Sequence, residues 1–136
     1  MNEDFVSFSL AKKLKEKGYP QVEKNALAMY NEDGEWYSLS PTLDDFYYCF
    51  KDFDRHDFVC PTISQVLKWL REEKKIHICI DIYDDGWFFD IASFYKGDTG
   101  VYEIEWPYKS SNVTPNYDSF EQAAIAGIEY CLDNLI

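Results

Sequence analysis

Residues 76–83 alternate between isoleucine and other side chains, and no other feature of the chain constrains its fold as strongly. The isoleucines stand at positions Ile76, Ile78, Ile80 and Ile82. Successive side chains of a β-strand point to opposite faces of the sheet, so a period of two places these residues on one face. We therefore expect a strand whose isoleucine face is buried in the core.

This strand begins a predicted antiparallel meander of three strands. The pair Asp85-Gly86 is typical of a two-residue hairpin turn, and residues 87–95 return as the second strand. A second turn is expected over residues 96–100, which contain two glycines. The third strand, residues 101–106, is expected to end at Pro107, because proline cannot donate a hydrogen bond to a neighbouring strand.

The register of the first two strands follows by counting if the aspartate-glycine pair forms the turn. Ile82 then faces Phe89, and on the other face Asp81 lies directly across from Asp90. A second loop of four residues adds three side chains of the third strand to the isoleucine face: Tyr102, Ile104 and Trp106.

Capping residues followed by apolar side chains at helical spacing predict three helices. Thr62 and Ser119 are each followed three residues later by glutamine, which completes a capping box. The predicted helices run from Ser7 or Ser9 to Gly18, from Thr62 to about Lys75, and from Ser119 to Leu135.

Residues 26–39 predict a hairpin around turn residues 31–34. Residues 40–60 stay unassigned, because Thr42 with Asp45 is compatible with the start of a helix whereas the acidic residues that follow favour a loop. This order of elements is typical of an α+β domain, in which helices pack on one face of an antiparallel sheet. The N-terminal hairpin could extend that sheet. The length of 136 residues predicts a single domain, residues 1–136.

The chain is strongly acidic, with 25 acidic and 13 basic residues and a net charge of −12. This charge opposes approach to phosphate backbones and anionic lipids, so we expect neither direct nucleic-acid binding nor membrane binding. Aromatic residues make up 18% of the chain, a share that argues against an acidic disordered segment.

The four cysteines, Cys49, Cys60, Cys79 and Cys131, show no metal-binding spacing. We expect reduced thiols in a cytoplasmic protein, since the acidic N-terminus lacks the basic start of a signal peptide. No cofactor is predicted.

Three segments resemble small hypothetical proteins of gut Bacteroidetes that are often associated with prophages or mobile elements. They are residues 14–18, residues 61–72 and the closing Glu-Gln-Ala-Ala-x-Ala-Gly-Ile-Glu-Tyr of residues 121–130. The resemblance implies a cytoplasmic, accessory-gene setting. It implies no activity, cofactor or catalytic residue.

The predicted sheet face opposite the isoleucines combines aromatic rings with carboxylates. We expect it to form an interaction surface made of Tyr83, Phe88, Phe94, Asp81, Asp90, Glu103 and Glu105. Two like charges across a strand pair favour a cation, a shared proton or a basic partner, although solvated carboxylates are the simpler interpretation. The candidates for a metal site are Asp81, Asp90 and His77, which are too few for a committed site. Residues 40–60, rich in aromatic side chains, could instead cover this face as a second core layer.

Three functions are therefore compatible with the sequence. The favoured one is a non-enzymatic interaction module that binds a protein partner or a second copy of itself. The second is an acidic mimic of nucleic acid that blocks a DNA-binding protein, because residues 81–105 hold seven acids against one lysine. The third is a metal-dependent enzyme that uses the paired carboxylates.

Overall fold

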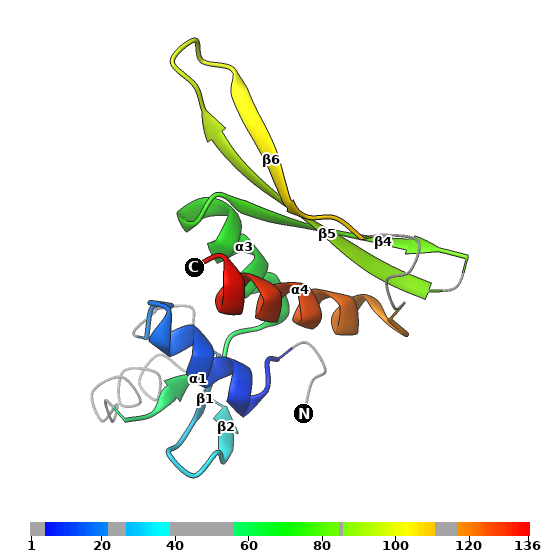
Figure 1. Ribbon diagram of the computed structural model, residues 1–136. Coiled ribbons are helices and arrows are strands. Elements are labelled where there is room, and N and C mark those ends of the chain that lie inside the picture. The colour runs from blue at the N-terminus through cyan, green and yellow to red at the C-terminus, as the bar shows by residue number, and fades with distance from the viewer. Residues whose placement is uncertain (1–4, 22–26, 39–55, 85, 111–116) are drawn as a thin grey trace. The chain divides into compact units, whose positions relative to one another are not determined.

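A computed structural model describes residues 5–21, 27–38, 56–84, 86–110 and 117–136. Within these residues the chain forms three helices and two antiparallel three-stranded sheets, which confirms the α+β prediction (Figure 1). The chain divides into two compact units, residues 1–62 and 63–136, and each is described by itself. The assignment of one domain stays a prediction.

The first unit contains a helix and a small sheet of order β2-β1-β3. The predicted N-terminal hairpin is confirmed, but it belongs to this sheet and does not extend the meander. The described elements are α1 (Phe8–Glu16), β1 (Ala28–Tyr30), β2 (Trp36–Ser38) and β3 (Phe58–Val59).

Ser7 is the cap of α1, because its Oγ accepts a hydrogen bond from the backbone N–H of Leu10 at 3.2 Å. The helix buries Leu10 and Leu14. Beneath it the Tyr30 hydroxyl donates to the Val6 carbonyl at 2.7 Å, which satisfies both groups inside the core. The helix considered at Thr42 and Asp45 lies outside the described residues.

The second unit contains the meander in the order β4-β5-β6, with helices α3 and α4 packed on it (Figure 1). The predicted helices and strands are all present, with ends shifted by a few residues. Their bounds are α3 (Ile63–Glu73), β4 (Ile76–Tyr83), β5 (Gly86–Lys96), β6 (Tyr102–Tyr108) and α4 (Phe120–Asn134).

Helix α4 starts at the predicted cap, where Ser119 Oγ accepts from the Gln122 backbone N–H at 3.1 Å. The helix packs closely on the sheet at Gly127, where an added Cβ would lie 2.9 Å from Ile78 Cγ2 and 3.3 Å from Phe89 Cδ2. Ile78 and Phe89 are buried there. A glycine at this position allows the helix backbone to approach the sheet.

The isoleucine face of β4 is only partly buried, so that prediction is wrong for half of the strand. Ile76 and Ile78 are buried, Ile80 is half-buried, and Ile82 is 57% exposed. The difference follows from which part of the strand α4 covers: the helix packs closely on Ile78 at Gly127, and Ile82 lies four residues further along the strand.

The predicted register of β4 and β5 is shifted by two residues. Tyr83 pairs with Gly86, so Asp81 lies across from Phe88 and Asp90 lies across from Cys79. Gly86 has a φ of 146°, a conformation that other residues rarely adopt, and it takes the first strand position instead of a turn position. A shift of two keeps every side chain on its predicted face.

The faces of β6 are the reverse of the prediction. Lys96 pairs with Tyr102, so five residues separate the pair and the register differs by one. Gly97 and Val101 close a three-residue loop through a 2.9 Å hydrogen bond, and Gly100, with a φ of 84°, is the left-handed residue that such a loop requires. A change of one residue moves every side chain of the strand to the other face.

The sheet face that carries His77 therefore also carries three side chains of β6, namely Tyr102, Ile104 and Trp106. The opposite face, which carries Ile76, also carries Glu103 and Glu105.

Strand β6 also continues past Pro107, where the prediction ended it. The pairing changes between Ile91 and Ser93, which face Tyr108 and Glu105, so β6 carries one extra residue at a β-bulge. A bulge tolerates proline because the ladder is interrupted there. Beyond the bulge the ring of Tyr108 stacks on Phe89 with centroids 4.7 Å apart.

Candidate functional site

The sheet of the second unit carries an apolar groove on the face opposite α4. It encloses about 460 Å³. We call this site the apolar groove; its lining residues are Arg71, His77, Cys79, Ala92, Phe94, Tyr102, Ile104 and Trp106.

Strand β6 supplies the most exposed part of the groove. Tyr102 is 61% exposed, Ile104 57% and Trp106 45%. Across the strand pair, the rings of Phe94 and Tyr102 meet edge to face with centroids 6.1 Å apart. Large apolar side chains exposed side by side are uncommon on a surface that contacts only water, so this groove is the candidate site.

The structure divides the predicted interaction surface between both faces of the sheet. Phe94 lines the apolar groove. On the same face, towards the other end of the sheet, lie four further residues of the predicted surface: Asp81, Tyr83, Phe88 and Asp90. Glu103 and Glu105 lie on the opposite face.

The facing pair of carboxylates is not formed, because Asp81 and Asp90 are diagonal neighbours. Asp90 Oδ1 accepts a hydrogen bond from the Ser110 backbone N–H at 2.5 Å, and Asp81 Oδ1 accepts from the Ile82 backbone N–H at 2.8 Å. Each carboxylate therefore has a local backbone donor, and the repulsion that would have favoured a shared cation is reduced.

The surroundings of His77 were a predicted metal site. Across the described ranges, no three His, Cys, Asp or Glu side chains come together as a metal site. Burial, and secondarily the charge of Asp90, raises the pKa of the Cys79 thiol. A thiol with a raised pKa stays protonated at neutral pH and is a poor nucleophile.

The remaining described cysteines, Cys60 and Cys131, are free and buried. Burial raises the pKa of Cys60 to about 11 and that of Cys131 to about 12. These thiols act as small core side chains. Cys49 lies outside the described residues.

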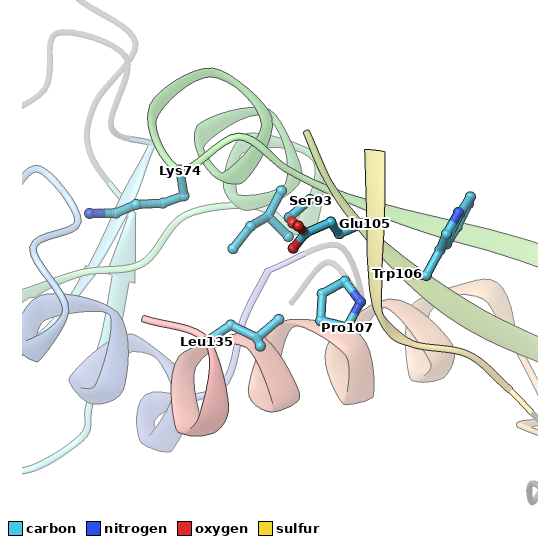
Figure 2. A pocket seen from close by; sticks show the side chains of 7 residues that line it. Lys74, Ser93, Glu105, Trp106, Pro107 and Leu135 are labelled. Atoms are coloured by element: carbon cyan, nitrogen blue, oxygen red, sulfur yellow. The ribbon is translucent and has the colours of Figure 1, made fainter. Parts of the chain in front are cut away.

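A second cavity, which we call the acidic pocket, lies on the other side of β6 and encloses about 430 Å³. In Figure 2 the Glu105 carboxylate points into it, while Trp106 points to the opposite side of the strand and Lys74 points away from Glu105. The lining residues are Lys74, Ile76, Ser93, Glu105, Trp106, Pro107 and Leu135. The pocket thus combines the Glu105 carboxylate with a floor of apolar side chains, Ile76, Pro107 and Leu135, and its lining also includes Lys74 and Ser93.

A further acid stands beside this pocket on the same face. Glu103 lies across from Tyr95, whose hydroxyl donates a hydrogen bond to the Glu103 carboxylate. This bond raises the pKa of Tyr95. The α4 side of β6 is therefore acidic, and the groove side is apolar.

The sequence analysis missed the three groove residues of β6, because a second loop of four residues places them on the isoleucine face. The signal that could have found them is Gly100, because glycine at the end of a short loop is typical of a three-residue hairpin with a left-handed last residue. Counting the strand from that loop places Ile104 on the same face as Phe94.

Among the described residues, no helix has both the length and the apolar character needed to cross a bilayer. Comparison with models of known protein families, with curated protein sequences and with solved structures finds no match to this chain.

Proposed function

We propose that this protein is a non-enzymatic interaction module that binds a protein partner through the apolar groove. The observation that carries the proposal is the exposure of Tyr102, Ile104 and Trp106 next to Phe94 on one sheet face. Burying such side chains against a partner releases the apolar surface from water, and aromatic residues are enriched at the centres of protein interfaces.

The chemistry of the groove supports binding in preference to catalysis. Its potential nucleophile, Cys79, has a raised pKa, and its histidine stands two positions away along the same strand. Side chains two residues apart on a strand are separated by about 7 Å, which is too far for direct proton transfer. The groove offers shape and apolar area more than reactive groups.

A second function, mimicry of nucleic acid, is less favoured because the acidic residues of the meander do not lie on one surface. Glu103 and Glu105 lie on the α4 face, whereas Asp81 and Asp90 lie on the groove face. A mimic of a phosphate backbone needs its charges along one track. The prophage setting implied by the resemblance is compatible with either function.

The experiment compares two isoleucines of equal exposure on opposite faces of the sheet. Ile104 and Ile82 are both 57% exposed, and only Ile104 lines the groove. Tagged wild-type protein, Ile104→Lys and Ile82→Lys are used to capture partners from an extract of the source cells, with bound proteins identified by mass spectrometry. Circular dichroism and thermal melts check that both variants fold.

We expect wild type and Ile82→Lys to retain the same protein and Ile104→Lys to lose it. Equal retention by all three proteins, or equal loss by both variants, would contradict a binding role for the groove.

A further inference from the structure

We propose that the partner contributes an extended segment that adds as a fourth strand to the free edge of β6, with apolar residues alternating with lysine or arginine. The inference rests on the proposed function and names the class of partner. Its basis is the different character of the two faces of one edge strand.

Among the residues that the structure describes, no strand pairs with the outer edge of β6. In the described part of the chain, β6 pairs with β5 alone. The Phe94 backbone N–H donates to the Lys75 carbonyl at 3.0 Å, on the side away from β6. Phe94 and Ile104 therefore form a non-hydrogen-bonded pair, and the N–H and C=O of Ile104 point to the outer edge. Such an edge is a template for an added strand.

The side chains of an added strand would meet two different environments. Those on one face would contact the apolar groove beside Ile104 and Trp106. Those at alternate positions would lie beside Glu103 and Glu105, where the acidic pocket begins. Its apolar floor suits the methylene stem of lysine or arginine, and the Glu105 carboxylate suits the charged end.

The negative charge beside the edge of β6 favours a basic segment over a second copy of this chain as the added strand. Two β6 strands paired antiparallel, about a two-fold axis perpendicular to the sheet, would keep the same face of both sheets on one side, which brings Glu103 and Glu105 of one copy next to those of the other. Like charges across a strand pair are destabilising. The net charge of −12 adds to the repulsion between copies.

The first experiment measures binding of defined peptides to the full chain by fluorescence anisotropy. One short peptide alternates lysine with valine, a second has the same composition with the lysines in one block, and a third replaces every lysine by glutamate. We expect the alternating basic peptide to bind about tenfold or more tightly than the other two, with weaker binding at high salt.

A pair of charge-matched variants tests the position of the acids. Glu103→Gln with Glu105→Gln removes two charges beside the edge, and Glu72→Gln with Glu73→Gln removes two exposed charges from the end of α3. We expect the first double variant to weaken binding about tenfold and the second to leave it nearly unchanged. Equal weakening by both would overturn the inference, because only net charge would then matter.

Methylated peptides test whether the segment binds as a strand. Only alternate residues of an added strand bond to the edge, so N-methylation of one alternating set removes binding and N-methylation of the other set leaves it. The apolar set is the critical one for a segment that runs antiparallel to β6. Equal binding of both methylated peptides would overturn strand addition.

The outcomes separate this inference from the proposed function. If the alternating peptide fails to bind while partner capture still depends on Ile104 and not on Ile82, the function stands and the strand inference is wrong. If neither result is obtained, both are wrong. A wild-type dimer in sedimentation that Ile104→Lys dissociates would show that a second copy occupies the edge and would overturn the basic partner.

Discussion

Replacing Gly127 by alanine tests how closely α4 packs on the meander. In an isolated helix this substitution is favourable by about 1 kcal/mol, because glycine loses more backbone entropy than alanine. Here the new Cβ would lie 2.9 Å from Ile78 Cγ2 and 3.3 Å from Phe89 Cδ2. The Cγ2 methyl is fixed to a branched Cβ, so it cannot move away without a costly change of rotamer.

The two effects have opposite signs, and overpacking is the larger. Extra volume in a packed core costs about 1–3 kcal/mol, so Gly127→Ala should lower the free energy of unfolding by about 1 kcal/mol after the helix gain is subtracted. Urea denaturation followed by circular dichroism and tryptophan fluorescence measures this change.

The control removes the obstructing methyl. Ile78→Leu keeps the volume of the side chain and lacks the Cγ2 branch, so Gly127→Ala should be neutral or stabilising in that background, with a coupling of about 1–2 kcal/mol between the sites. A rise of about 1 kcal/mol on Gly127→Ala in the wild-type chain would refute the close approach of α4 to the sheet.

Four other outcomes are expected. Burial raises the pKa of the Cys131 thiol from its ordinary 9.0 to about 12. The Cys131 thiol therefore ionises first in the unfolded chain, and this residue alone should lower the free energy of unfolding by about 1 kcal/mol per pH unit above pH 9; denaturation across this range should show a shallower fall for Cys131→Ala. Ser119→Ala should cost about 1 kcal/mol in urea denaturation by removing the cap of α4, and a change near zero would contradict the cap. Phe89→Ala should cost about 3–5 kcal/mol, whereas Tyr95→Ala, at a position 50% exposed, should cost less than about 0.5 kcal/mol by the same assay. Thermal melts with and without EDTA should coincide, and a midpoint several degrees lower with the chelator would favour a bound metal.

The local signals of the sequence predicted the elements well. Ser7 and Ser119 have the side-chain geometry expected of caps, and residues 76–83 form the expected strand. These features depend on residues a few positions apart, which interact through the backbone of one helix or strand. The α+β class follows from the order of such elements.

The candidate site was less predictable because it depends on which face each strand presents. Phe94 lies on the face opposite the isoleucines, as the sequence predicted, whereas Ile104 and Trp106 were predicted on the isoleucine face and line the apolar groove with Phe94. One residue in a loop decides between these arrangements. The acidic pocket was not predicted, since it combines the start of β4, both later strands and the end of α4.

The sequence by itself determined where the chain forms helices and strands, since caps, turns and apolar periods act between near neighbours. The tertiary structure alone decided which side chains are covered. Ile78 and Ile82 belong to the same alternating pattern, yet one is buried and the other exposed, because α4 packs closely at Ile78 through Gly127. Likewise the left-handed Gly100 decides that Ile104 faces the groove while Glu103 and Glu105 face the opposite side. Burial and facing depend on contacts between residues far apart in the chain, which no local pattern contains.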